Sequence, residues 1–233
     1  MKRKFMFFQS AALLALMSIM CSAAIPLSGE YSLSVPGKVQ EKDQWCWAAV
    51  SEAVLEYYGR YYSQQEIAAY GTPGQDNATN DLFQANRPNH GVDEILAYFG
   101  GIYSLGVYSP VPGSDIVESI QNLSRPMPIG LRDSSGRDHM MVIIGVNYDS
   151  QNLSLRLMDP VDGRKFWLPY YDVVSGDNYQ WIETLALQRS GPMLDNAVDL
   201  DIADMNPQNN WVAPNIDLPA KLADNPNWDG IAR

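Results

Sequence analysis

Apolar residues recur at intervals of three and four along the stretch that begins at Cys46. They are Trp47, Val50, Val54, Leu55 and Tyr58. This period matches one face of an α-helix, so the pattern predicts a helix that Cys46 opens and Gly59 closes. Asp43 or Gln44 can cap the first turn, because their side-chain oxygens can accept hydrogen bonds from the free N–H groups there.

Helical spacing continues through the first half of the chain. Ser63 and Glu66 form a capping box, which predicts a second helix over residues 63–70 that Gly71 stops. Residues 71–91 are polar and rich in Gly, Asn and Pro, so we expect a long surface loop there. Two more helices are predicted over residues 92–99, ended by Gly100 and Gly101, and over residues 115–123, capped by Ser114.

The second half of the chain has the short apolar runs that are typical of β-strands. The predicted strands cover residues 126–131, 139–148, 153–158, 166–170 and 181–187. Residues 149–152 form a turn between two of these strands, which makes them an antiparallel hairpin. Helices followed by a run of antiparallel strands predict an α+β domain.

Both ends of the chain differ from this domain. Residues 1–23 combine a basic start, an apolar run and small residues, which predicts a secretory signal peptide cleaved after Ala23 or Ala24. The apolar run is too short, and too interrupted by polar residues, to favour a membrane anchor. Residues 190–233 are acidic and rich in Pro and Asn, so we expect one domain over residues 24–189 followed by an acidic tail. The protein is then secreted or periplasmic.

Removal of the signal peptide changes the cysteine count and the charge. The chain has 233 residues, two cysteines and a net charge of −11. Cleavage removes Cys21 and three basic residues but no acidic one, so Cys46 alone remains and the charge becomes −11 − 3 = −14. A single cysteine forms no intramolecular disulfide. An acidic chain without a basic patch is not expected to bind nucleic acid or an anionic membrane, and we expect a monomer.

Cys46 has the position of a nucleophile at the start of its helix. The positive end of the helix dipole and the free N–H groups there favour thiolate over thiol. The same N–H groups can stabilise an oxyanion beside the sulfur, and Gln40, six residues earlier, can supply a second donor. The alternative is that Cys46 is a small buried residue on a core-facing helix.

A thiol nucleophile needs a base, and the chain has two histidines. His139 opens the most apolar strand after a polar loop, whereas His90 lies within a predicted loop. The hairpin turn folds Asp159 back towards His139, where a carboxylate can orient the imidazole. Alternatively, His139 is an ordinary strand-end residue and Asp159 caps a turn. One cysteine and two distant histidines do not have the spacing of a metal site, and no cofactor is expected.

Short motifs around these residues occur in a characteristic order. They are Val35-Pro36-Gly-Lys-Val-Gln40, Gln44-Trp45-Cys46-Trp47-Ala48-Ala49, Asp138-His139-Met-Met-Val-Ile-Ile-Gly-Val146 and Leu157-Met158-Asp159-Pro160. The set resembles the papain-like cysteine peptidases over about residues 30–188. It is most similar to the short bacterial secreted forms, which include plant-pathogen effector proteases and relatives of bacteriocin-processing peptidases. One departure is that Asp138 and Met140 flank the histidine, where the family often has a glycine.

The resemblance implies a papain-like α+β fold, with the Cys46 helix packed on an antiparallel sheet and a cleft between them. It also implies hydrolysis of a protein or peptide substrate through a thioester acyl-enzyme. In that reaction Cys46 attacks, His139 shuttles the proton, Asp159 orients His139, and Gln40 contributes to the oxyanion hole. The same site can serve a transpeptidase or a cell-wall amidase, and the same scaffold can serve a secreted binding protein.

Overall fold

The computed structural model describes residues 28–177 and 179–188. The predicted signal peptide and the predicted acidic tail therefore lie outside the described residues. The helices are α1 (Cys46–Tyr57), α2 (Gln64–Gly71), α3 (Val92–Gly100), α4 (Gly113–Val117), the π-helix η1 (Glu118–Asn122) and α5 (Tyr170–Ser175). The strands are β1 (Gly29–Ser32), β2 (Ser104–Val107), β3 (Met127–Asp133), β4 (Asp138–Tyr148), β5 (Leu153–Met158), β6 (Lys165–Pro169) and β7 (Tyr179–Leu187).

The strands form one antiparallel sheet in the order β2-β7-β3-β4-β5-β6. β4 is the central strand of this sheet. Its first half pairs with β3 on one side, its second half pairs with β1 on that same side, and β5 runs along its other side. Helices combined with an antiparallel sheet confirm the predicted α+β class.

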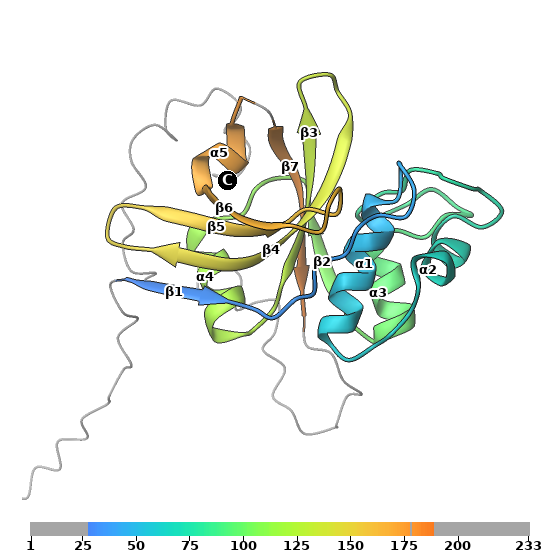
Figure 1. Cartoon of the computed structure of the whole chain (residues 1–233), viewed down its shortest axis with the longest axis horizontal. Coiled ribbons are helices and arrows are strands. Elements are labelled where there is room, and N and C mark those ends of the chain that lie inside the picture. The colour runs from blue at the N-terminus through green and yellow to red at the C-terminus, as the bar shows by residue number, and fades with distance from the viewer. Residues whose placement is uncertain (1–27, 178, 189–233) are drawn as a thin grey trace, which may run out of the picture.

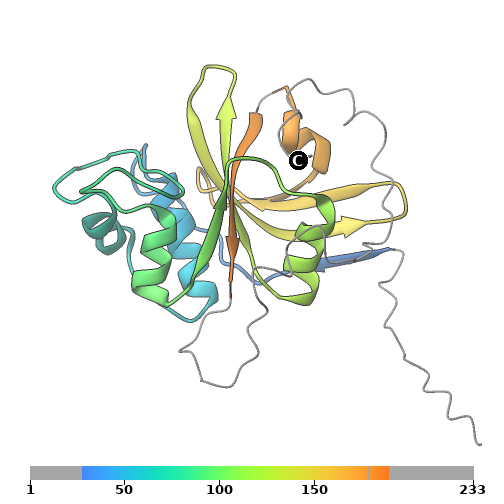
Figure 2. The ribbon, with the colours of Figure 1, turned by 180° about the vertical axis from the view of Figure 1, so that it is seen from behind.

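Two apolar cores lie on the two faces of the sheet. Val142 and Ile144 of β4 belong to the core that includes Trp47 of α1, whereas Met141 and Ile143 belong to the core on the other face. In Figure 1, α1, α2 and α3 form a group beside the sheet and α4 lies behind it; Figure 2, seen from behind, shows α4 in front of the sheet. The sequence of β4 is a continuous apolar run because each face of the strand is covered by one of the two cores.

The predicted Cys46 helix is confirmed as α1, but its predicted caps are wrong. Trp45 is the N-cap residue, and no side chain of the described residues caps this helix end. The N–H of Trp45 donates to the carbonyl of Lys42, 3.0 Å away, in a turn that leaves Asp43 and Gln44 exposed to solvent. The first N–H groups of α1 therefore have no side-chain acceptor.

Three other sequence predictions need correction. The predicted helix over 115–123 begins at Gly113 after Pro112, and it changes to π geometry at Glu118. Ser114 does not cap it, because its hydroxyl donates to the carboxylate of Asp115 instead. Apart from Gly71, which ends α2, the predicted surface loop over 71–91 has no helix or strand, yet it buries Leu82 and Phe83. The sequence also did not predict β2 or α5.

The capping box at Ser63 and the helix over 92–99 are confirmed as α2 and α3, respectively. Gly71 is the last residue of α2, where a Cβ atom would lie 2.6 Å from the Trp47 ring. This glycine therefore allows α2 to approach α1 closely. Within the described residues, no helix has the length and apolar character needed to cross a membrane.

Candidate active site

Cys46 is the first residue of α1 and is partly exposed. Both of its neighbours are buried tryptophans: Trp45 is 3% exposed and Trp47 is fully buried. The indole N–H of Trp47 donates to the carbonyl of Ala78, 3.0 Å away, which ties α1 to the loop before α3. The thiol is therefore held on a rigid helix end whose free N–H groups surround it.

The β4–β5 hairpin brings His139 and Asp159 together. His139 is the second residue of β4, and Asp159 directly follows β5. The His139 Nε2 atom lies 2.9 Å from Asp159 Oδ1, at hydrogen-bond distance. The structure thus places these two predicted site residues in contact across the hairpin.

A tight loop between β5 and β6 fixes the Asp159 carboxylate. Its Oδ1 atom also accepts a hydrogen bond from the N–H of Val161, at 3.0 Å. The backbone N–H of Asp159 donates to the carbonyl of Arg164, and the N–H of Gly163 donates to the carbonyl of Asp159. The carboxylate is therefore oriented before any substrate binds.

Cys46 and Asp159 together stabilise the charged form of His139. Burial alone would lower the pKa of His139, but its hydrogen bond to Asp159 and the nearby Cys46 side chain raise it to about 9. Burial would likewise raise the pKa of Asp159, but the hydrogen bonds from His139 and from the Val161 N–H hold it below its ordinary value. Because Nε2 is engaged by Asp159, Nδ1 is the ring nitrogen available to Cys46.

Gln40 lies in the turn that leads into α1, close to the Asp159 loop. Its backbone N–H donates to the carbonyl of Pro160, 2.7 Å away. Its side-chain Nε2 donates to the carbonyls of Lys42 (3.0 Å) and Asp43 (2.8 Å). Among the described residues, its Oε1 atom is buried without a hydrogen-bond partner. The amide nitrogen of Gln40 is thus bonded to the turn before Cys46.

The second histidine belongs to a different part of the molecule. The His90 ring stacks on Tyr70, with 4.2 Å between ring centroids, and its Nδ1 lies 3.0 Å from a carboxylate oxygen of Glu94. Its environment is therefore a surface cluster on α2 and α3. Among residues 28–177 and 179–188, no group of three or more His, Cys, Asp or Glu side chains is placed to hold a metal ion.

One residue beside the site was not singled out in the sequence. Gln64, in the first turn of α2, is 2% exposed and bonds to the backbone on both sides of Gln40. Its position after the capping residue Ser63 is typical of an exposed first helical turn. Contacts with the segment before Cys46 and with Glu52 of α1 bury it, and neither contact follows from the local sequence.

Comparison with known proteins gives one family match. A family model described as the papain-like cysteine protease AvrRpt2 matches residues 30–168, which is more than half of the chain. The matched range includes Cys46, His139, Asp159 and Gln40. No curated protein matches the sequence significantly.

Several solved structures have a similar backbone fold at low sequence identity. A protein described as a C39-like peptidase from Bacillus anthracis is 13% identical, with a TM-score of 0.48, covering 70% of this chain and 100% of its own. The peptidase domain of Streptococcus ComA, a bi-functional ABC transporter, is 18% identical, with a TM-score of 0.45, covering 66% and 97%. A double glycine motif protease from an AMS/PCAT transporter, in complex with its leader peptide, is 15% identical, with a TM-score of 0.43, covering 67% and 93%.

Proposed function

Because the chain belongs to the family of the papain-like cysteine protease AvrRpt2, and is therefore a cysteine peptidase, we propose that it hydrolyses peptide bonds through Cys46, His139 and Asp159. One observation supports this assignment most directly. The imidazole of His139 lies at hydrogen-bond distance from Asp159, and it is near enough to the Cys46 side chain for that side chain to raise its pKa. This is the order of contacts that a nucleophile, its base and an orienting carboxylate require.

The proposed reaction begins with a thiolate on Cys46 and a proton on His139. The sulfur bonds to the substrate carbonyl carbon while the C=O π electrons move to oxygen. The oxyanion then re-forms the carbonyl and expels the amine, which takes the proton from His139 and leaves a thioester. His139 next removes a proton from water, whose oxygen attacks the thioester and releases the carboxylic acid and the Cys46 thiolate.

Two donors are proposed for the oxyanion: the backbone N–H of Cys46 and the side-chain Nε2 of Gln40. The Cys46 N–H lies in the first turn of α1, where N–H groups have no partner within the helix. Gln40 Nε2 reaches the turn before Cys46, where it bonds to the carbonyls of Lys42 and Asp43. Donation to an oxyanion exchanges one of these two bonds for a charge-assisted one, which is stronger.

Replacing Gln40 with alanine tests the second donor. Loss of one oxyanion donor lowers kcat by about 10²–10³ in enzymes with similar acyl chemistry, so we expect Gln40→Ala to lower kcat by that factor with little change in KM. The matched control is Gln44→Ala, because Gln44 is an exposed glutamine of the same turn. Equal kcat values for the two variants would remove Gln40 from the mechanism.

Thiol reactivity tests the proposed nucleophile without any knowledge of the substrate. His139 keeps its proton up to about pH 9, so its positive charge is present beside Cys46 at pH 6 and favours the thiolate. We expect iodoacetamide to alkylate Cys46 at pH 6 about 10²-fold faster than it alkylates the same residue in the urea-unfolded chain, where an ordinary thiol is almost wholly protonated. Mass spectrometry of the Cys46 peptide measures both rates. Equal rates would favour a binding protein on the same scaffold.

A further inference from the structure

The buried amide of Gln64 makes three hydrogen bonds at the junction of α1 and α2. Its Oε1 accepts from the backbone N–H of Glu41, at 2.9 Å. Its Nε2 donates to the carbonyl of Val39, at 2.8 Å, and to the carboxylate of Glu52 on α1, at 2.9 Å. Val39 and Glu41 are the two chain neighbours of Gln40, so one side chain holds the backbone on both sides of the proposed oxyanion donor.

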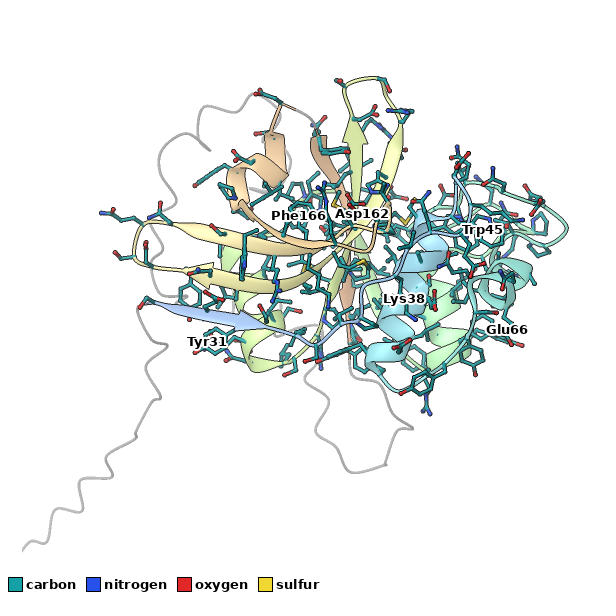
Figure 3. The ribbon with its side chains drawn as sticks, in the orientation of Figure 1. Tyr31, Lys38, Trp45, Glu66, Asp162 and Phe166 are labelled. Atoms are coloured by element: carbon teal, nitrogen blue, oxygen red, sulfur yellow. The ribbon has the colours of Figure 1, made fainter. Side chains whose placement is uncertain are left out.

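The segment before Gln40 is also attached to α1 by charge. The Lys38 ammonium lies 2.7 Å from Glu52 and 2.6 Å from Glu56, both on α1. Glu52 thus contacts both Lys38 and Gln64, and Figure 3 shows Lys38 in front of α1. Through these contacts, residues 38–41 are fixed to the helix that carries the thiol.

The opposite side of this segment contacts the loop that carries Asp159. The backbone N–H of Gln40 donates to the carbonyl of Pro160, and Gly37 lies against Gly163. A Cβ atom at Gly37 would be 2.3 Å from the Gly163 carbonyl oxygen, so the two backbones approach as closely as glycine permits. Gln40 is therefore held between Gln64 and the Asp159 loop.

Burial of the Gln64 amide lowers the stability of the fold unless its polar atoms are paired, and an apolar side chain would fill the same space without that penalty. The Gln64 amide meets the requirement, since both Nε2 and Oε1 are bonded. The side chain of Gln64 does not bond to that of Gln40, so it acts on Gln40 through the backbone.

We propose that Gln64 is a positioning residue, which fixes the backbone at Val39 and Glu41 so that the Gln40 amide reaches the oxyanion. This inference rests on the proposed function and adds a residue to it. Misplacement of a catalytic group by about 1 Å can lower a rate by about 10²-fold. Loss of the three Gln64 bonds should therefore affect the acylation step while leaving the Cys46–His139 contact intact.

The test compares Gln64→Leu, Gln40→Ala and the double variant in the full chain. The substrate is a peptide that the wild-type chain cleaves, identified by mass spectrometry of a digested peptide mixture. We expect Gln64→Leu to lower kcat by about 10-fold to 10²-fold, with KM and the rate of iodoacetamide alkylation at pH 6 within about 2-fold of wild type. We also expect the double variant to match Gln40→Ala within about 3-fold, because Gln64 acts through Gln40.

Two further variants separate positioning from general destabilisation. Gln121→Leu removes the acceptor of the Tyr148 hydroxyl, 2.7 Å away at the far end of β4, and we expect wild-type kcat. Gln64→Glu combined with Glu52→Gln keeps an amide–carboxylate bond between α1 and α2 and an acceptor for the Glu41 N–H, but it removes the donor to Val39. It also replaces the Glu52 carboxylate beside Lys38, which keeps its ion pair with Glu56. We expect this charge-matched pair to recover part of the kcat that Gln64→Leu loses.

Each outcome of this experiment decides the inference. It is overturned if Gln64→Leu has the kcat of Gln121→Leu, if it slows alkylation as much as hydrolysis, or if its effect adds fully to that of Gln40→Ala. Should Gln64→Leu not fold, the charge-matched pair decides: a kcat loss of about 3-fold or more at unchanged KM and alkylation supports the inference, and wild-type kcat overturns it. If the wild-type chain cleaves no peptide, or Cys46→Ala cleaves as fast, the proposed function fails first.

Discussion

Replacement of Cys46 with alanine will abolish nearly all peptide hydrolysis while the chain folds normally. In the proposed mechanism the sulfur forms the acyl-enzyme, so the variant has no nucleophile to divide the reaction into two steps. Removal of a nucleophile costs on the order of 10⁶ in kcat in a serine peptidase, and we expect a loss of about 10⁵–10⁶ here. Activity on a cleaved peptide, measured at high enzyme concentration, gives the ratio.

The fold of the Cys46→Ala variant should remain intact for two reasons. Alanine is the most favourable residue in a helix, and Cys46 makes no disulfide in the described structure. Circular dichroism and thermal unfolding should therefore match the wild type, with a change of about 1 kcal/mol or less in the free energy of unfolding. Hydrolysis at the wild-type rate by a folded Cys46→Ala protein would rule out the cysteine mechanism. A variant that does not fold would instead make Cys46 a structural residue.

The helix that begins at Cys46 and the hairpin that carries His139 could be predicted from the sequence because both follow from local patterns. The apolar period after Cys46 sets α1, and α1 begins at the thiol as predicted. The hairpin over residues 139–158 is also local, since its two strands are joined by a short turn. Such a turn places the first residues of β4 close to the residues that follow β5, which is why Asp159 reaches His139.

Features that depend on distant contacts could not be predicted in this way. β2 has four residues and becomes a strand because it pairs with β7, about 80 positions later in the chain. Phe83 is buried because it covers Gly106 of β2, although its surrounding sequence is that of a polar loop. Gln64 has the sequence context of an exposed helix start and is buried by the segment before Cys46 and by Glu52 of α1. Local propensity is overridden in each case by tertiary packing.

Replacement of His139 with alanine will lower kcat by about 10⁴–10⁶, because the base that takes and returns the proton is lost. In the wild type, Asp159 and Cys46 outweigh burial and raise the pKa of His139 to about 9. The imidazolium is therefore present below pH 9, and kcat/KM should fall as the pH rises through about 9. The residual activity of His139→Ala should not show this fall, because the group that loses the proton is absent. A pH profile of kcat/KM from pH 5 to 10 measures both effects.

Two further measurements test whether the effect of His139→Ala is specific to that histidine: the rate of iodoacetamide alkylation and the activity of His90→Ala. Without the imidazolium, Cys46 loses its neighbouring positive charge, so iodoacetamide labelling at pH 6 should slow to about the rate of the unfolded chain. His90→Ala is the matched control, because His90 stacks on Tyr70 and contacts Glu94 in a separate cluster. We expect that variant to keep the wild-type kcat, pH profile and labelling rate. Equal losses of kcat in the two variants would mean that removal of a histidine acts through folding. A loss of kcat confined to His90→Ala would instead identify His90 as the base.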